Sequence, residues 1–447
     1  MSDDERGITR RDFLERTGAA GLGVALGGVL PVASRREQPG RSANETVVVA
    51  VIGRNGRGMV HAQNFARLPN AQVAYLCDVD GAVLRKAAGA IRQSRTAVAI
   101  EDFRRALDDK AVDAVSIATP DHWHTAMAIL ALKAGKHVYL EKPCGHNARE
   151  GELLTAAAKK YDRHVQQGSQ QRSAARTIEA LQMVREGAIG APYLVRAWYA
   201  NSRGGIGHGR PAPVPSTLNY ELWQGPAPRT PYRDNVVHYN WHWFKRWGTG
   251  EICNNGTHEI DIARLALGVD YPTSVTSSGG RYHFQDDWEF PDTQDVTFEF
   301  AGGKRILWQG QSCNALKPFD RGRGTAIYGT GGSMVLDRDG YLQYDLKQKL
   351  VKESLEPKQG NGVDLIGDDA ATWQHMENFL GAIRTGETLR APITDGARSV
   401  HLCHLGNIAQ YTGRALRIDP ANGHIMGDTE AMRHWSRSYA PGWAPTA

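Results

Sequence analysis

The sequence predicts an α/β chain with two folded domains, a parallel sheet with helical crossovers and an α+β domain with a large, open, mainly antiparallel sheet. From residue 46 to 168, short apolar runs alternate with helical patterns, which is typical of a parallel sheet. From 169 to 420, many runs alternate apolar and polar side chains with period two, and Gly-Gly turns join some of them. Residues 1–45 are expected to form a leader and linker, and residues 421–447 a C-terminal tail.

Each element follows from its local pattern. In the first domain the expected strands are Thr46–Ile52, Gln72–Cys77, Val112–Ala118, His137–Leu140 and His164–Gln167, and the expected helices are Gly56–Leu68, Gly81–Ile91, His122–Ala134 and Asn147–Tyr161. In the second domain the expected helices are Ser173–Gly187, Glu251–Leu267, Thr372–Thr385 and Gly396–Gly413, the last two packing back on the first domain. Its expected strands are Ala191–Ala200, Thr273–Tyr282, Thr293–Phe300, Lys304–Gln311, Gly324–Gly329 and Ser333–Leu336.

A glycine-rich turn, Gly53-Arg54-Asn55-Gly56-Arg57-Gly58, links the first expected strand to the first expected helix. Such a turn lets backbone N–H groups approach a pyrophosphate at a helix N-terminus. Asn55 stands where a middle glycine is usual, and asparagine tolerates a left-handed backbone better than most residues. Asp78, twenty residues after Gly58, can accept hydrogen bonds from an adenine ribose. The pattern predicts a Rossmann-type domain that binds NAD, with NADP less favoured because Asp78 would repel a 2′-phosphate, although Arg54 moderates this preference.

A lysine stands at the end of another expected strand of this sheet. Glu141-Lys142-Pro143 follows His137–Leu140, and strand ends in an open parallel sheet face the ligand. Partial burial beside a positively charged nicotinamide would lower the pKa of Lys142 and suit it to exchange a proton with a substrate hydroxyl. Lys142 is the predicted catalytic base, with an ordinary surface lysine as the alternative, and Glu141 could pair with it or face the cofactor.

Further cofactor contacts are expected where the strand Val112–Ala118 ends. Thr119 and His124 are placed to line the cofactor site, whereas His122 could equally begin a helix. The expected cofactor-binding residues are Gly53, Asn55, Gly56, Arg57, Gly58, Asp78, Thr119, His124, Glu141 and Lys142.

Candidate substrate residues lie in the second domain. Asn254 and His258 are four residues apart and would share a helix face, with Asp261 one turn further on. A histidine there could share proton transfer with a lysine, while a capping asparagine and a structural histidine are the alternative. The aromatic run 238–243 offers flat faces beside hydrogen-bonding groups, which suits sugars, unless its rings only pin a loop to the core. The expected substrate-binding residues are Arg172, Tyr239, Trp241, His242, Asn254 and His258.

The composition excludes several classes of protein. The 447 residues include 41% hydrophobic and 23% charged residues, as in ordinary globular proteins. A net charge of +5 without a long basic run argues against binding to nucleic acid or to a membrane surface. The five cysteines are scattered, with no C-x-x-C pair, so neither a disulfide framework nor a metal site is expected.

The N-terminal residues are expected to form a targeting signal rather than part of a folded domain. Thr9-Arg10-Arg11-Asp12-Phe13-Leu14 precedes a weakly apolar, small-residue stretch at 18–30. This layout resembles a twin-arginine export signal and is too short and glycine-rich for a stable membrane span. A disordered tail with chance arginines is the alternative. We therefore expect export by the twin-arginine machinery to the periplasm.

Five motifs together resemble the Gfo/Idh/MocA oxidoreductases, a family that includes glucose–fructose oxidoreductase and inositol dehydrogenase. They are Ile52-Gly53 with Gly58, Cys77-Asp78-Val79-Asp80, Thr119-Pro120-Asp121-His122-Trp123-His124, Ala134-Gly135-Lys136-His137-Val138 and Glu141-Lys142-Pro143. The similarity runs from about residue 46 to 420 and is closest to exported members. It implies that Lys142 and His258 match the family's catalytic lysine and histidine. The family's usual aspartate four residues before that histidine is Asn254 here, which cannot act as a base.

Two activities follow from the resemblance. The first is hydride transfer between NAD and a sugar, sugar derivative or cyclitol, with Lys142 and His258 as acid/base groups. The second is a glycoside hydrolase that uses NAD transiently, through oxidation, elimination, hydration and reduction. A sugar-binding protein without activity is the weakest alternative. Open sheets often pair face to face, so a homodimer or homotetramer is expected.

Overall fold

The computed structural model describes residues 46–88, 97–355 and 370–447. The predicted export signal, the end of the predicted helix Gly81–Ile91 and part of the link to the C-terminal helices lie outside these residues.

The first domain is a six-stranded parallel sheet in the order β3-β2-β1-β4-β5-β6. Its elements are β1 (Val47–Ile52), α2 (Arg57–Arg67), β2 (Ala71–Cys77), α3 (Gly81–Ala88), β3 (Val98–Ile100), α4 (Arg104–Asp108), β4 (Ala114–Ile117), α5 (Asp121–Lys133), β5 (His137–Leu140), α6 (Ala148–Tyr161) and β6 (Val165–Gln167). All six residues of β1 are buried, since helices cover both faces of a parallel sheet. The predicted parallel sheet is confirmed, and β3 and α4 were not predicted.

The second domain contains a ten-stranded mixed sheet, mainly antiparallel, in the order β15-β14-β13-β12-β7-β10-β9-β8-β16, with β11 paired to β7. Its strands are β7 (Pro192–Ser202), β8 (Ser274–Gly280), β9 (Thr293–Glu299), β10 (Arg305–Gln311), β11 (Cys313–Asn314), β12 (Arg323–Gly329), β13 (Gly332–Leu336), β14 (Gly340–Tyr344), β15 (Leu350–Leu355) and β16 (Leu416–Arg417). Only β7 and β10 pair in parallel in this sheet. The large, mainly antiparallel sheet is confirmed, while β14, β15 and β16 were not predicted.

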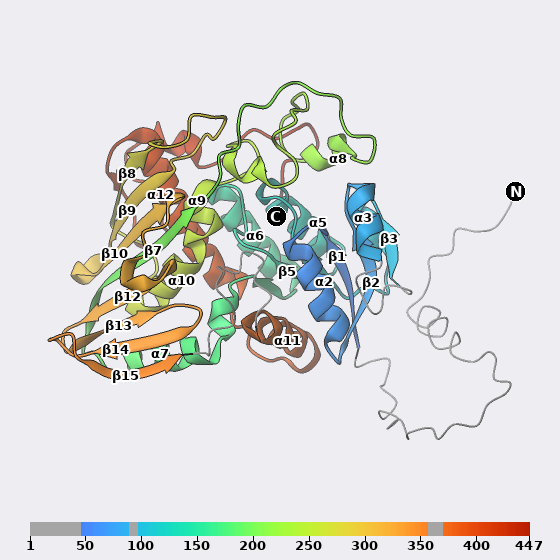
Figure 1. The fold of residues 1–447 in the computed structure, drawn as a ribbon. Helices are drawn as coiled ribbons and strands as arrows, with labels where there is room; N and C mark the ends of the chain where they lie inside the picture. Colours follow the sequence, from blue (N-terminus) through green and yellow to red (C-terminus); the bar gives the residue numbers. More distant parts are fainter. Residues whose placement is uncertain (1–45, 89–96, 356–369) are drawn as a thin grey trace, which may run out of the picture.

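Helices cover one face of this sheet and join the two domains (Figure 1). The helical elements are η3 (Gln170–Ser173), α7 (Ala175–Arg185), α8 (Tyr220–Gln224), η4 (Asn240–Trp243), α9 (Gly250–Asn254), α10 (Gly256–Leu267), η5 (Ala301–Gly303), η6 (Pro318–Asp320), α11 (Ala370–Thr385), α12 (Ile393–Thr412) and η7 (Ala431–His434). Side chains of α10 and α12 share a core with β7, β10 and β12. Helix α11 instead contributes Met376, Phe379 and Leu380 to the core of the first domain.

The C-terminal residues lie against the first domain. Trp443 meets Trp123 of α5 edge to face, with 5.0 Å between ring centroids. Arg437 donates a hydrogen bond of 2.9 Å to Glu150 of α6, and the Tyr439 hydroxyl donates to the same carboxylate. Within the described residues, no helix is both long enough and apolar enough to cross a membrane.

Candidate active site

Glycines shape the turn between β1 and α2. Gly53 has φ +80°, and a Cβ there would lie 2.6 Å from the carbonyl oxygen of Ala118. A Cβ on Gly58 would lie 1.5 Å from the carbonyl oxygen of Gly53. Gly56 takes φ +54° with open space around its Cα. Asn55 does not adopt the left-handed backbone conformation that asparagine accepts more readily than most residues, so this property is not needed here. The turn therefore packs tightly against the end of β4 at Gly53 and is open around Gly56. This leaves room for a pyrophosphate to approach the backbone.

Two buried polar groups beside this turn lack partners, and both fit a bound dinucleotide. Arg54 is 1% exposed, its Nε and Nη1 have no hydrogen-bond partner, and Nη2 reaches only the sulfur of Met59 at 3.3 Å. Burial lowers the pKa of Arg54 to about 10, against the pull of Asp78. Thr119 Oγ1, at the end of β4, is also buried without a partner. Because buried polar groups are normally satisfied, these atoms indicate a polar ligand or water at this edge of the sheet.

Asp78 ends β2 next to the same turn. Its carboxylate accepts hydrogen bonds from the backbone N–H groups of Arg54 at 2.6 Å and of Asp80 at 3.0 Å. Burial raises the pKa of Asp78, although these two donors act in the opposite direction. The carboxylate is thus oriented beside the glycine turn, where an adenine ribose would lie in a Rossmann fold.

Lys142 reaches across from the first domain to the second. Its Nζ donates hydrogen bonds to the backbone oxygen of Asn254 at 2.5 Å and to Oδ1 of the same residue at 3.3 Å. Burial lowers the pKa of Lys142, as do Arg323 and Arg57, while Glu141 and Asp121 raise it. The lysine is therefore neither a free surface group nor locked in an ion pair, which is the state that a general base needs.

His258 lies one turn beyond Asn254, across the junction of α9 and α10. It is 6% exposed, and no hydrogen bond to its ring is found within the described part of the chain. Burial lowers the pKa of His258 well below its usual value, and the positive charges of Lys142 and Arg323 lower it further. The shift favours the neutral ring, which can hydrogen-bond a substrate oxygen. The structure places Lys142 against Asn254 and close enough to His258 for its charge to act on the ring.

Glu141 has a different role from the lysine beside it. Its Oε1 receives hydrogen bonds from Arg57 Nε at 2.8 Å and Gln170 Nε2 at 2.9 Å, and His61 Nε2 lies at 3.0 Å. Burial alone would raise its pKa, but Arg57 and His61 hold the pKa of Glu141 well below its usual value. Arg57 and Glu141 thus form a fixed, partly buried pair under the site. Sequence reasoning missed His61, although its position one helical turn after Arg57 places it on the same face of α2.

The aromatic segment brings two of its predicted substrate residues to one place. The rings of Trp241 and His242 stack with centroids 3.6 Å apart, and His242 Nδ1 lies 2.6 Å from the backbone oxygen of Tyr239. Burial lowers the pKa of His242 to about 3, with Lys142 adding to the shift. Tyr239 is half exposed, and its hydroxyl accepts a hydrogen bond of 2.8 Å from Arg203.

Two arginines behind this segment were missed by sequence reasoning. Arg203 donates through Nε to Glu251 at 2.8 Å, and Arg323 donates through Nε to Glu259 at 2.7 Å. Both guanidinium groups lie 5.5 Å from the ring centroid of Tyr199. These residues come from β7, β12 and the α9–α10 region, which are distant in sequence, and no local motif marks them.

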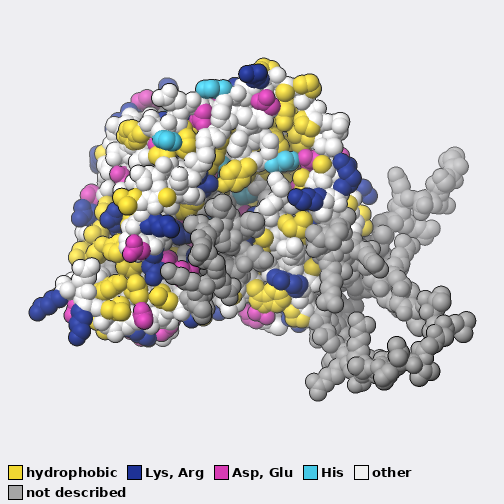
Figure 2. Space-filling view, in the orientation of Figure 1, with side chains coloured by type: hydrophobic (Ala, Val, Ile, Leu, Met, Phe, Trp, Pro, Cys, Tyr) yellow, Lys and Arg dark blue, Asp and Glu magenta, His cyan; other side chains and the backbone are white. Residues whose placement is uncertain are grey.

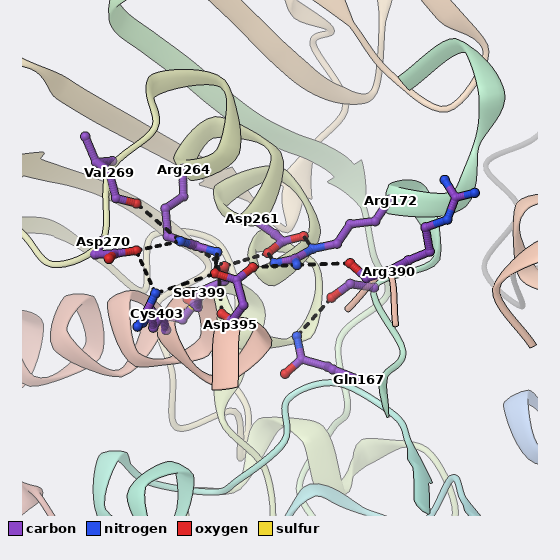
Figure 3. Close-up of polar contacts among 12 residues, drawn as sticks. Gln167, Arg172, Asp261, Arg264, Val269, Asp270, Arg390, Asp395, Ser399 and Cys403 are labelled. Atoms are coloured by element: carbon purple, nitrogen blue, oxygen red, sulfur yellow. Dashed lines mark hydrogen bonds and ion pairs between the residues drawn. The ribbon is translucent and has the colours of Figure 1, made fainter. Parts of the chain in front are cut away.

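Arg172 is not where the sequence analysis expected it. It is 7% exposed, and its guanidinium binds both oxygens of Asp261, with Nη1 2.6 Å from Asp395 Oδ2 (Figure 3). Arg264 donates to the other oxygen of Asp395 at 2.6 Å. A guanidinium enclosed by two carboxylates has no group left for a substrate, so Arg172 and Asp261 hold the fold together here.

His124 also differs from the prediction. It is buried, with Nδ1 2.6 Å from the backbone oxygen of Pro143 and Nε2 2.8 Å from that of Thr119. Its two nitrogens therefore tie the ends of β4 and β5 together rather than facing a cofactor. Cys144, two residues after the catalytic candidate, is fully buried, and burial raises the pKa of its thiol to about 12, which makes it a packing residue.

A surface hollow of about 500 Å³ lies apart from these groups. Its walls come from α11, the start of α7 and the loop before β2, and they include neither Lys142 nor His258. This hollow and the candidate catalytic groups thus lie in different places, and the unsatisfied buried groups identify the site better than surface shape does. Among the described residues, no group of three or more His, Cys, Asp and Glu side chains could hold a metal ion.

Comparison with known protein families gives two matches. Residues 47–169 match the model described as "Oxidoreductase family, NAD-binding Rossmann fold", and residues 182–344 match "Oxidoreductase family, C-terminal alpha/beta domain". Together the two matches include all six strands of the first sheet, β7 to β14 of the second, and both Lys142 and His258.

Curated relatives match the chain over part of their length. A glycosyl hydrolase family 109 protein of Saccharopolyspora erythraea is 30% identical over 201 residues, which are 41% of this chain and 44% of that protein. Inositol 2-dehydrogenase of Rubrobacter xylanophilus is 33% identical over 164 residues, 36% of this chain and 46% of that protein. The chain thus spans somewhat less than half the length of these relatives.

Solved structures share the fold. An oxidoreductase from Agrobacterium radiobacter in complex with NAD+, L-tartaric acid and magnesium aligns with a TM-score of 0.65 and 16% identity, over 83% of this chain and 98% of that chain. An aldose-aldose oxidoreductase from Caulobacter crescentus complexed with glycerol aligns with a TM-score of 0.63 and 20% identity, over 83% of this chain and all of that chain.

Proposed function

Because the chain belongs to the Gfo/Idh/MocA oxidoreductase family, we propose that it transfers a hydride between NAD and a hydroxyl-bearing carbon of a sugar, sugar derivative or cyclitol. The observation that carries the proposal is the contact of Lys142 with Asn254, because it brings the candidate base of the first domain to the candidate substrate residues of the second. The inositol 2-dehydrogenase relative supports this substrate class.

A bound nicotinamide would supply the hydride acceptor. Gly53, Gly56 and Gly58 would shape the turn that holds the pyrophosphate, with Arg57 opening the helix that faces it. Asp78 would orient the adenine ribose. The Asp78 carboxylate favours NAD over NADP because it would repel a 2′-phosphate. The guanidinium of Arg54, whose Nε and Nη1 have no hydrogen-bond partner, is the group that would bind a 2′-phosphate if NADP were used.

Lys142 would take the proton from the substrate hydroxyl. Its lowered pKa keeps a larger neutral fraction than an ordinary lysine has at the same pH, and Asn254 directs its Nζ towards the second domain. His258, neutral for the reasons given above, would donate to or accept from the same oxygen. Asparagine at position 254 cannot serve as a base, so Lys142 and His258 would move the proton.

A second activity is favoured by one observation, the match to glycosyl hydrolase family 109 proteins. In this case the same lysine would serve a cycle of oxidation at a ring carbon, elimination of the glycosidic group, addition of water and reduction, which consumes no NAD overall. The two activities need the same site and differ in their net products.

One assay distinguishes them. The purified protein loaded with NAD would be given free sugars and cyclitols in one series and aryl glycosides in another, with absorbance of reduced nicotinamide and of released aglycone followed together. Net reduction with free sugars supports the dehydrogenase, and aglycone release without net reduction supports the hydrolase. No response in either series, from a protein that binds NAD, would refute both.

We also propose that residues 1–45 direct export through the twin-arginine pathway and that the exported protein is a dimer or tetramer. Support for the first is the Arg10-Arg11 motif. Support for the second is the edge strand β15, on which Leu350, Val351 and Leu355 are exposed beside the apolar patch over β13–β15 in Figure 2. Replacing both arginines by lysine should retain the precursor in the cytoplasm, and sedimentation of wild type against L350E/V351E tests the assembly.

A further inference from the structure

We propose that residues 203–249, named the strap from here on, close over the dinucleotide site and set the rate at which the dinucleotide is exchanged. The inference rests on the proposed dinucleotide site but needs no particular substrate. Figure 1 shows the strap, which contains α8, arching from the end of β7 over the upper edge of the first domain towards α3. It contacts that domain in two places, which lie on opposite sides of β1 in the sheet.

The first contact, the adenosine grip, holds the residues directly after Asp78. Gly81 N–H donates to the backbone oxygen of Thr217, and Asn219 N–H donates to that of Val79, both at 2.9 Å. Asp80 forms an isolated β-bridge with Leu218. These backbone bonds place the strap across the end of β2, where the adenine ribose of a dinucleotide would lie.

Two side chains strengthen the adenosine grip. His238 Nε2 lies 2.8 Å from Asp80 Oδ2, and Asn219 Nδ2 donates to Glu101 Oε1 at 2.5 Å, just after β3. The His238 side chain is 30% exposed, so this pair is open to water on one side. Asp80 therefore binds the strap, whereas Asp78, two residues earlier, faces the glycine turn.

The second contact, the nicotinamide grip, holds the start of α5, directly after Thr119. His122 N–H donates to the backbone oxygen of Trp247 at 3.2 Å, and Trp123 Nε1 donates to that of Trp223 at 3.0 Å. Thr249 Oγ1 donates to the buried Asp121 at 2.5 Å. The C-terminal tail covers this grip from outside, since Ala440 N–H donates to Pro226 at 3.0 Å.

The position of the two grips explains why the strap encloses a dinucleotide. Strand β1 lies between β2 and β4 in the sheet, and the glycine turn follows β1. A dinucleotide lies across the carboxyl ends of these strands, with its adenosine at β2 and its nicotinamide beyond β4. A chain attached at both flanks has to open at one of them before the ligand can leave. The adenosine grip is the more polar and more exposed of the two, so exchange starts there.

Aromatic packing holds the strap together and attaches it to Trp288 of the second domain. The rings of Trp243 and Trp288 stack 3.7 Å apart, and Trp223 packs against both Tyr220 and Trp247. Its buried aromatic side chains share one hydrophobic cluster with Phe284, Trp288 and Phe290, which lie outside the strap. Opening therefore breaks the adenosine grip without unfolding the segment, and a dinucleotide held in this way would stay bound through many turnovers.

The test measures dissociation directly, with NADH as the probe. The full chain is loaded with NADH, mixed rapidly with excess NAD, and followed by energy transfer from tryptophan to NADH. H238A and N219A should each release NADH about tenfold faster than wild type, because each loses one hydrogen-bonded contact of the grip. H208A is the matched control, since His208 of the strap pairs with Asp287 of the second domain. Within the described residues no hydrogen bond or ion pair joins His208 to the first domain, so its rate should be unchanged.

Unchanged release in both H238A and N219A, or equal acceleration in H208A, would overturn the proposal. Thermal unfolding midpoints of the three variants, measured without dinucleotide, show whether any change reflects general loss of stability. If the NADH release rate correlates with the midpoint, whether or not the substituted residue belongs to the adenosine grip, the proposal is wrong. Failure of the proposed function is seen separately. A protein that retains NADH but acts on no sugar refutes the proposed function and leaves the strap proposal standing. Rapid NADH loss from an active wild-type enzyme refutes the strap proposal and leaves the proposed function standing.

Discussion

Helix α10 carries two buried polar clusters, one around His258 and one around Asp261. They differ in whether their charged groups have partners of opposite charge. Around Asp261, every carboxylate oxygen of Asp261 and Asp395 meets an arginine or a serine, as Figure 3 shows. Around His258, the ring has no partner among the described residues, and Lys142 bonds only to an uncharged asparagine. Buried charges that neutralise one another stabilise a fold, whereas buried groups left without a counter-charge are available for chemistry.

The largest effect is expected from Lys142→Ala. The loss of the lysine that contacts Asn254 should lower kcat by about 10³-fold, the usual scale for a general base. Steady-state rates and the thermal midpoint are measured together. Lys136 is the matched control, because its Nζ donates to the backbone oxygens of Asp109 and Val112 and has no place in the site. K136A should lower stability with kcat preserved, and an inactive K136A would contradict the contrast.

Arg172→Gln should affect stability rather than chemistry. It leaves Asp261 and Asp395 partly unpaired in a buried site, which should cost about 3 kcal/mol in the free energy of unfolding. Urea unfolding of the full chain, with and without NAD, measures the change. Normal stability together with a raised KM would instead return Arg172 to the substrate site that the sequence suggested.

Asn254→Asp sharpens the comparison by placing a carboxylate directly against Lys142, the proposed base. Oδ1 lies 3.3 Å from Lys142 Nζ, so a carboxylate there should raise the pKa of the lysine. In wild type, burial lowers this pKa, and the rate should rise with pH until the lysine is neutral. In N254D the acid limb of kcat/KM should move to higher pH. An unmoved limb would exclude Lys142 as the titrating group.

The smallest effect is expected where an ion pair is exposed. Arg149 and Glu152 form such a pair on α6, at 2.6 Å, and water screens their attraction. R149A should change the free energy of unfolding by less than about 1 kcal/mol. Chemical denaturation beside R172Q provides the measurement, and a loss as large as that of R172Q would show that burial is not what distinguishes the two pairs.

The local sequence was sufficient to predict those parts of the molecule whose structure depends on neighbouring residues in the chain. The glycine turn, Asp78 and Lys142 were recognisable because a strand, a turn and a helix are each specified within a few residues. The strand β15 was missed because, as an edge strand, all but one of its residues are exposed and it carries no alternation of apolar and polar side chains. The arginines at 203 and 323 were missed because their partners Glu251 and Glu259 are 48 and 64 residues away.

The sequence by itself determined the class of fold, the dinucleotide turn and the identity of the candidate base, since backbone conformation and strand ends are encoded locally. The tertiary structure alone decided which charges are neutralised. Arg172 becomes structural because Asp261 and Asp395, 89 and 223 residues further on, converge on it. Lys142 stays available because the residue brought against it, 112 positions later, is an asparagine. The pKa of a buried group depends on neighbours in space, and those are fixed only when both sheets are in place.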